Sequence, residues 1–198
     1  TDISALASLK EVTGNIVIRN SYNGADLTGL ENIVSAGGLQ VGSADVASKA
    51  TELHMISMKA LETLSGDISV YNDQVTYVLF EKLATIGGSV MFNAPSLQSF
   101  EFPVLTTVGQ DLNIQGLNEE NKAAGTIATL ELPELTSVVG VLSVNNLAKL
   151  TSMNFLKLKE TGGLDFHTVP VMLETINLPE IETVNGMSII HISEPTRH

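Results

Sequence analysis

The chain has 198 residues, 43% of them hydrophobic and 16% charged, so it can bury the core of one ordinary domain. The net charge of −12, with ten Lys and Arg and no basic cluster, argues against binding to nucleic acid or to an anionic membrane surface. Cysteine is absent, which excludes disulfides and thiolate metal sites, and no apolar run is long enough to cross a membrane.

One pattern recurs from the first residues onward. It opens with a leucine, places a branched apolar residue three positions later, usually adds a glycine two positions further on, and continues with alternating apolar residues. The stretches "LATIGGSVMF" and "LTTVGQDLNI" are two copies. Alternation with a period of two predicts strands with one buried face. The pattern starts eight times, at Leu9, Leu30, Leu61, Leu83, Leu105, Leu135, Leu158 and Ile181.

A second alternating apolar pair comes shortly before most of the opening leucines. Phe100 and Phe102, for example, lead into Pro103, which cannot donate to a strand ladder and turns the chain. A unit of about 22 residues that reads strand, turn, strand, turn is too small to bury its own apolar face. Stacked units cover one another, so we expect an all-β fold, a right-handed β-solenoid of about eight coils.

Three coils depart from the regular length. Those that start at Leu30 and Leu105 are longer by about eight small or polar residues, within 42–50 and 116–125, which we interpret as surface loops. The coil that starts at Leu158 is one residue short, and we expect a bulge or kink there.

The two motifs, L-x-x-V-x-G-x-L-x-I and L-x-x-F-x-F-P-x-L, resemble the leucine-rich repeat of the receptor L-domain family. The resemblance runs from Leu9 to about Ile189. It implies a secreted or cell-surface module for adhesion or protein binding, with no catalytic, cofactor or metal site and no membrane insertion of its own. Its partner would be an extracellular protein or glycan. The chain lacks the cysteine caps of animal receptors and any N-x-[ST] sequon, so we favour a bacterial surface protein.

Five residues are our candidates for ligand contacts. Tyr71 and Tyr77 fall outside the core pattern and could stack on a sugar or anchor a partner. Asn118, Glu119 and Glu120 lie in the second long loop. Two other functions stay open: an architectural spacer or wall-organising domain without a specific ligand, and, more remotely, a polysaccharide-active enzyme.

Three rows of polar residues recur from coil to coil, and we interpret each as structural. An asparagine row should form an internal amide ladder. A row of hydroxyl residues is typical of strands beside a turn, although such a row could also order water as an ice-binding surface does. Two aspartates two coils apart should be solvated charges rather than a catalytic pair. The rows are Asn20, Asn72, Asn93, Asn145 and Asn146; Thr63, Thr85, Thr107, Ser137 and Thr183; and Asp67 and Asp111.

The histidines form no i, i+4 pair and stand near no carboxylate motif, so we expect no metal site. Residues 1–189 should form a single solenoid domain, a fragment cut at both ends. After residue 189 the pattern stops, and 190–198 resemble the translation of a transposase-type sequencing adapter, which we interpret as a non-native tail.

Overall fold

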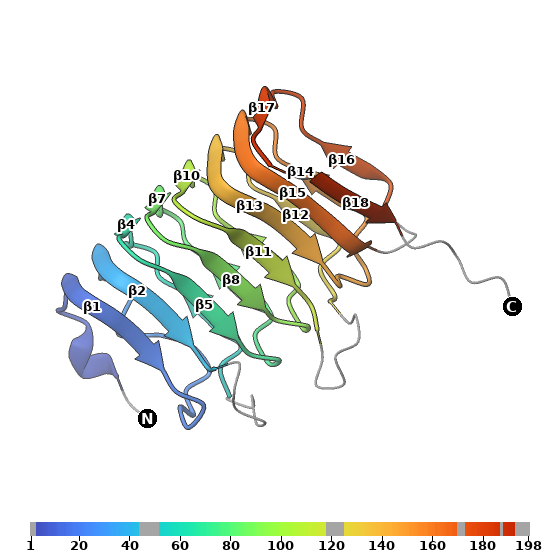
Figure 1. The fold of residues 1–198 in the computed structure, drawn as a ribbon. Coiled ribbons are helices and arrows are strands. Elements are labelled where there is room, and N and C mark those ends of the chain that lie inside the picture. Colours follow the sequence, from blue (N-terminus) through green and yellow to red (C-terminus); the bar gives the residue numbers. More distant parts are fainter. Residues whose placement is uncertain (1–2, 44–51, 118–124, 170–172, 187, 193–198) are drawn as a thin grey trace, which may run out of the picture.

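The computed structural model describes residues 3–43, 52–117, 125–169, 173–186 and 188–192. Within these ranges the chain forms one short 3₁₀ turn, η1 (Ser4–Leu6), and is otherwise built from parallel strands. The strands stack coil upon coil into an elongated solenoid (Figure 1). The expected all-β solenoid is therefore confirmed.

The longest sheet receives one strand or a pair of short strands from every coil (Figure 1). Each strand pairs in parallel with its counterpart in the next coil, and eight coils in succession give about seven complete turns. In order along the rod they are β1 (Glu11–Ile18), β2 (Ser35–Val41), β4 (Thr63–Leu64) with β5 (Ile68–Tyr71), β7 (Thr85–Ile86) with β8 (Val90–Asn93), β10 (Thr107–Val108) with β11 (Leu112–Gln115), β13 (Ser137–Asn145), β15 (Glu160–Val169), and β17 (Thr183–Val184) with β18 (Ser188–Ile192).

The opposite side of the solenoid is divided into two sheets of three strands. The first contains β3 (Met55–Ser57), β6 (Tyr77–Leu79) and β9 (Ser99–Glu101), and the second contains β12 (Thr129–Glu131), β14 (Ser152–Asn154) and β16 (Thr175–Asn177). The longer coils explain where these sheets begin. One insertion directly precedes β3, and the other lies between β11 and β12.

Aliphatic ladders fill the space between the sheets. In the six inner coils the opening leucines and the residues three positions later point inward, as Leu61 and Ile86 illustrate, with exposed fractions of 0% and 1%, whereas Leu9 in the first coil is 36% exposed. Phe80 stacks on Phe102 with ring centroids 4.9 Å apart, and Phe92 meets Phe100 edge-on at 5.0 Å. Each coil thus covers its neighbour, which supplies the burial that one coil alone could not reach.

The short coil that starts at Leu158 has the expected irregularity. The pairing of β13 with β15 shifts register between Val138 and Val141. The bulge absorbs the missing residue, so that Leu164 and Phe166 still enter the core. At the far end β18 continues to Ile192, so strand pairing passes residue 189, while 193–198 lie outside the described residues.

The second long loop should be dispensable for folding. Its residues 118–124 lie outside the described part of the chain, but its ends meet, because the Gly125 N–H donates to the Gly116 carbonyl at 3.3 Å. We expect that replacing 118–124 with a two-residue glycine turn lowers the free energy of unfolding by less than about 1 kcal/mol, since loop-closure entropy changes slowly with length. Circular dichroism and a denaturant titration test this, and loss of the β signal would contradict it.

Candidate functional site

A straight row of hydroxyl groups follows the long sheet at one corner of the solenoid. Ser35 pairs with Thr63, and the row continues in register through Thr85, Thr107 and Ser137 on five consecutive coils. Counting two residues from Leu30, as for the other coils, would place Asn32 in this row, but strand pairing places Ser35 there. Ser35 stands five residues after Leu30, whereas Thr63 stands two residues after Leu61, so three extra residues before the strand bring Ser35 into the row.

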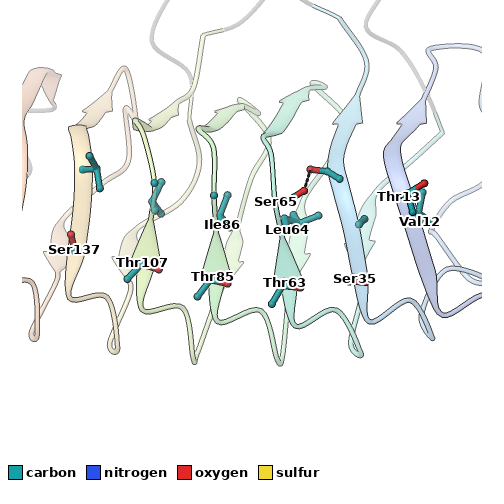
Figure 2. A pocket seen from close by; sticks show the side chains of 16 residues that line it. Val12, Thr13, Ser35, Thr63, Leu64, Ser65, Thr85, Ile86, Thr107 and Ser137 are labelled. Atoms are coloured by element: carbon teal, nitrogen blue, oxygen red, sulfur yellow. Dashed lines mark hydrogen bonds between the residues drawn. The ribbon is translucent and has the colours of Figure 1, made fainter.

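The hydroxyl row forms one wall of a groove with a volume of about 630 Å³ that runs along the rod. Figure 2 shows the side chains of Thr63, Thr85, Thr107 and Ser137 aligned on successive coils. The Ser65 hydroxyl also lines the groove and donates to the Gly37 carbonyl of the preceding coil at 3.4 Å.

Glycines form the floor of the groove because neighbouring coils approach closely there. A Cβ built on Gly109 would lie only 2.8 Å from the carbonyl carbon of Gly87, and one on Gly37 would lie 2.8 Å from the carbonyl oxygen of Gly14. A side chain at these positions would push the coils apart. Glycine backbone therefore lines the groove together with the side chains of Leu64, Ile86 and Val108.

Asp67 lies between β4 and β5, and Asp111 lies between β10 and β11. Both carboxylates accept hydrogen bonds from backbone N–H groups of the following coil. The Asp67 carboxylate accepts a hydrogen bond from Ser89 N at 2.7 Å, and Asp111 accepts one from Val141 N at 2.8 Å. They lie two coils apart, as expected, but they are not merely solvated charges. Each carboxylate fixes the bend of the following coil, which explains both residues without catalysis.

The long sheet is free of charge across most of its length. No residue of β2, β4, β5, β7, β8, β10, β11 or β13 is Asp, Glu, Lys or Arg, although the chain carries a net charge of −12. The outward residues of these strands, together with the groove, are called the neutral face below; the exposed carboxylates of Asp67 and Asp111 stand at the bends between its short strands. Besides the hydroxyl row, an in-register row crosses this face, formed by Gln40, Ser69, Met91, Asn113 and Ser143.

The asparagines at the end of the long sheet serve the backbone, as expected. Asn72, Asn93 and Asn145 are buried. Asn93 Oδ1 accepts from Leu117 N at 3.0 Å, and Asn145 Oδ1 accepts from His167 N at 2.9 Å. They do not form one continuous ladder, because Gln115 stands between Asn93 and Asn145 in the register.

The two candidate tyrosines lie on different sheets. Tyr71 ends β5 in the long sheet and Tyr77 begins β6 on the opposite side, and both are half-buried. They therefore form no common aromatic platform. Burial, followed by the negative charge of Glu101 and a hydrogen bond to it, raises the pKa of the Tyr77 hydroxyl. The other candidates, Asn118, Glu119 and Glu120, lie outside the described residues.

His167 has a carboxylate partner that the sequence analysis missed. Its Nδ1 lies 2.6 Å from Asp165 Oδ1, a contact with a single carboxylate that the search for carboxylate motifs did not reveal. The signal was available, because residues two apart on a strand share a face. Ser143 Oγ donates to the same aspartate, Asp165 Oδ2, at 3.4 Å, and it accepts from the Asn145 amide.

In the described ranges, no three His, Cys, Asp or Glu residues gather as metal ligands. Nor does this part of the chain contain a helix with the length and hydropathy needed to cross a bilayer. Comparison with known protein families, with curated proteins and with solved structures gave no match.

Proposed function

We propose that the chain is a non-enzymatic interaction module of a secreted or cell-surface protein, which binds an extracellular protein or glycan through its neutral face. The observation that carries this proposal is the absence of charge from eight strands of a strongly acidic chain. The centres of protein interfaces are depleted of charged residues, because a buried charge without a partner is costly.

The groove is suited to binding a ligand rather than to catalysing a reaction. Its lining residues include serines, threonines and glycines, and none is His, Asp, Glu, Lys or Arg. A hydroxyl without a neighbouring base is a poor nucleophile, so the row at Thr63, Thr85 and Thr107 is suited to hydrogen bonding. This argues against the polysaccharide-active enzyme, and no specific observation favours a spacer.

The ligand suited to this face is uncharged and elongated. The groove presents the same hydroxyl once per coil, at a spacing of about 4.8 Å, so a chain lying along the rod would meet equivalent donors and acceptors repeatedly. A neutral glycan or an uncharged extended segment of a protein has this chemistry. A polyanion would gain nothing there, since no cation lines the groove.

The proposal is tested by screening the protein against an array of glycans and extracellular proteins. Substitutions that introduce charge into the groove are then tested for binding. Thr85→Glu together with Thr107→Glu should weaken every contact made through the groove at least tenfold, because each buried carboxylate would lack a partner. Thr183→Glu is the control, since Thr183 lies on the same line of the sheet but outside the groove, separated from Ser137 by Glu160. Unchanged binding by the double variant would refute the site, and an array without any binder would favour the spacer.

A further inference from the structure

The side of the solenoid opposite the neutral face carries a groove that runs from coil to coil. Two hollows, of about 380 Å³ and 250 Å³, share Glu131 and Pro133 among their lining residues and so form one continuous depression, called the rear groove below. The larger hollow lies where the strand ladder is interrupted between β9 and β12, and the smaller one lies over β12, β14 and β16.

The residues inserted between β11 and β12 account for the interruption. On the long sheet the same two coils stay paired through β11 and β13, whereas β9 and β12 belong to different sheets. Among the described residues, the ladder bond that would join Phe102 N to Glu131 O is not formed. The coils remain in contact, because Thr126 Oγ1 donates to Leu97 O at 2.7 Å. The rear groove is therefore a depression of the surface and not an opening between two coils.

One wall of the rear groove is an apolar row. Pro103, Pro133 and Leu156 each stand two residues before the opening leucine of the next coil, and all three line the groove. Leu156 is 47% exposed. In the two preceding coils the same position holds Lys59 and Glu81, whose charged groups lie 3.6 Å apart. The row thus changes from an ion pair to apolar side chains where the groove begins.

The other wall is a polar row that presents mainly hydrogen-bond acceptors. Glu131, Asn154 and Asn177 are in register on β12, β14 and β16, and Glu101 holds the equivalent position on β9. Asn177 Nδ2 donates to Asn154 Oδ1 at 2.5 Å, and Asn154 Nδ2 donates to Glu131 Oε1 at 2.7 Å. Glu101 accepts from the Ser99 hydroxyl at 2.6 Å. Within the described residues neither glutamate has an ion pair, and no lysine, arginine or histidine lines the groove.

A ligand that fits both walls has an apolar surface on one side and several donors on the other. An ionised carboxylate only accepts hydrogen bonds, and both glutamates keep unused lone pairs. A sugar ring has this amphipathic form, with C–H groups on its faces and hydroxyl groups around its rim, and in an extended glycan it is about as long as the coil spacing of about 4.8 Å. A peptide backbone carries as many carbonyls as N–H groups, and its carbonyls would find few donors here. An anionic ligand would be repelled by both carboxylates.

We infer that the rear groove binds a neutral, extended glycan. The faces of its rings pack on Pro103, Pro133 and Leu156. Its hydroxyl groups donate charge-assisted hydrogen bonds to Glu101 and Glu131. This site lies opposite the neutral face and does not depend on the function proposed above.

Isothermal titration calorimetry tests the inference with three hexasaccharides, built from β-1,4-linked glucose, β-1,3-linked glucose and β-1,4-linked N-acetylglucosamine. We expect at least one of them to bind, and its affinity to fall at least about tenfold in Glu101→Gln with Glu131→Gln, because two charge-assisted bonds become neutral ones. Glu62→Gln with Glu182→Gln removes the same charge from exposed positions outside the rear groove and should change the affinity less than about twofold. Failure of all three glycans to bind, or equal losses in the two double variants, would overturn the inference.

The apolar wall is tested with a second matched pair. Leu156→Ser should weaken binding of the same hexasaccharide about fivefold, since the ring faces lose apolar contact. Val104→Ser alters a side chain that is 38% exposed but does not line the rear groove, and it should leave the affinity unchanged. Equal effects of the two serine variants would contradict packing of sugar rings on this row.

Two further measurements separate this site from charge attraction and from the neutral face. A hexalysine peptide should bind at least about tenfold more weakly than the best hexasaccharide, because it lacks the ring faces and hydroxyl groups that the two walls accommodate. Tighter binding of hexalysine would show a cation site instead of a glycan site. The Thr85→Glu, Thr107→Glu variant should keep its affinity for the hexasaccharide, and a loss in that variant would place the glycan on the neutral face and overturn the inference.

Discussion

Leu105→Ala and Leu132→Ala should each lower the free energy of unfolding by about 2–5 kcal/mol, the cost of removing a buried leucine and leaving a cavity. Both side chains lie in the ladders between the sheets, with exposed fractions of 2% and 0%. Every coil relies on its neighbours for burial, so a cavity in one coil weakens contacts with the coils on both sides.

Thr107→Ala is the matched control for Leu105→Ala, because it lies two residues further along and points outward from the same coil. Its half-buried hydroxyl belongs to the groove wall, so we expect a change within about 0.5 kcal/mol. Chemical denaturation of the three variants measures the differences. Equal destabilisation by Leu105→Ala and Thr107→Ala would show that the leucine is not a core residue.

Gly109→Ala should destabilise by about 1–3 kcal/mol without removing any contact, because it forces two coils apart. The added Cβ would lie 2.8 Å from the Gly87 carbonyl carbon, and this backbone, in the bend directly after β7, cannot move aside without shifting its coil. The substitution tests whether glycine is needed for close stacking rather than for turn geometry.

Gly14→Ala is the corresponding control. Gly14 lies in β1 at the edge of the long sheet, and a Cβ added there would meet no atom within 4 Å. We expect a change within about 0.5 kcal/mol, since alanine loses less backbone entropy than glycine on folding. If Gly109→Ala and Gly14→Ala change the free energy of unfolding equally little, the close approach of the coils at Gly109 would be contradicted.

The sequence was sufficient to predict the architecture, because the core repeats. Leu61, Leu83 and Leu105 stand in equivalent positions, so each coil independently predicts the same inward ladder. The bulge after Leu158 could also be predicted, since a missing residue would otherwise turn Leu164 and Phe166 outward. Because the pattern repeats, the fold can be predicted from the sequence even though no single coil is stable alone.

The surfaces were harder to predict, because they depend on register between coils. Counting from each leucine placed Asn32 in the hydroxyl row, whereas strand pairing selects Ser35. The interruption between β9 and β12 requires knowing that β11 and β13 stay paired while the opposite strands separate. The spacing of the repeats along the chain indicates an inserted loop, but it does not indicate on which side of the solenoid the strand ladder is interrupted.

Cysteine cross-linking tests most directly the stacking register that creates the hydroxyl row and the neutral face. The chain has no cysteine of its own, so an introduced pair is unambiguous. Thr85→Cys with Thr107→Cys places thiols on adjacent coils, whereas Thr63→Cys with Thr107→Cys places them two coils, about 9.6 Å, apart. We predict rapid bridging of the first pair by dibromobimane and little bridging of the second. Faster bridging of Thr63→Cys with Thr107→Cys, or equal rates for both pairs, would contradict the coil order and the row that depends on it.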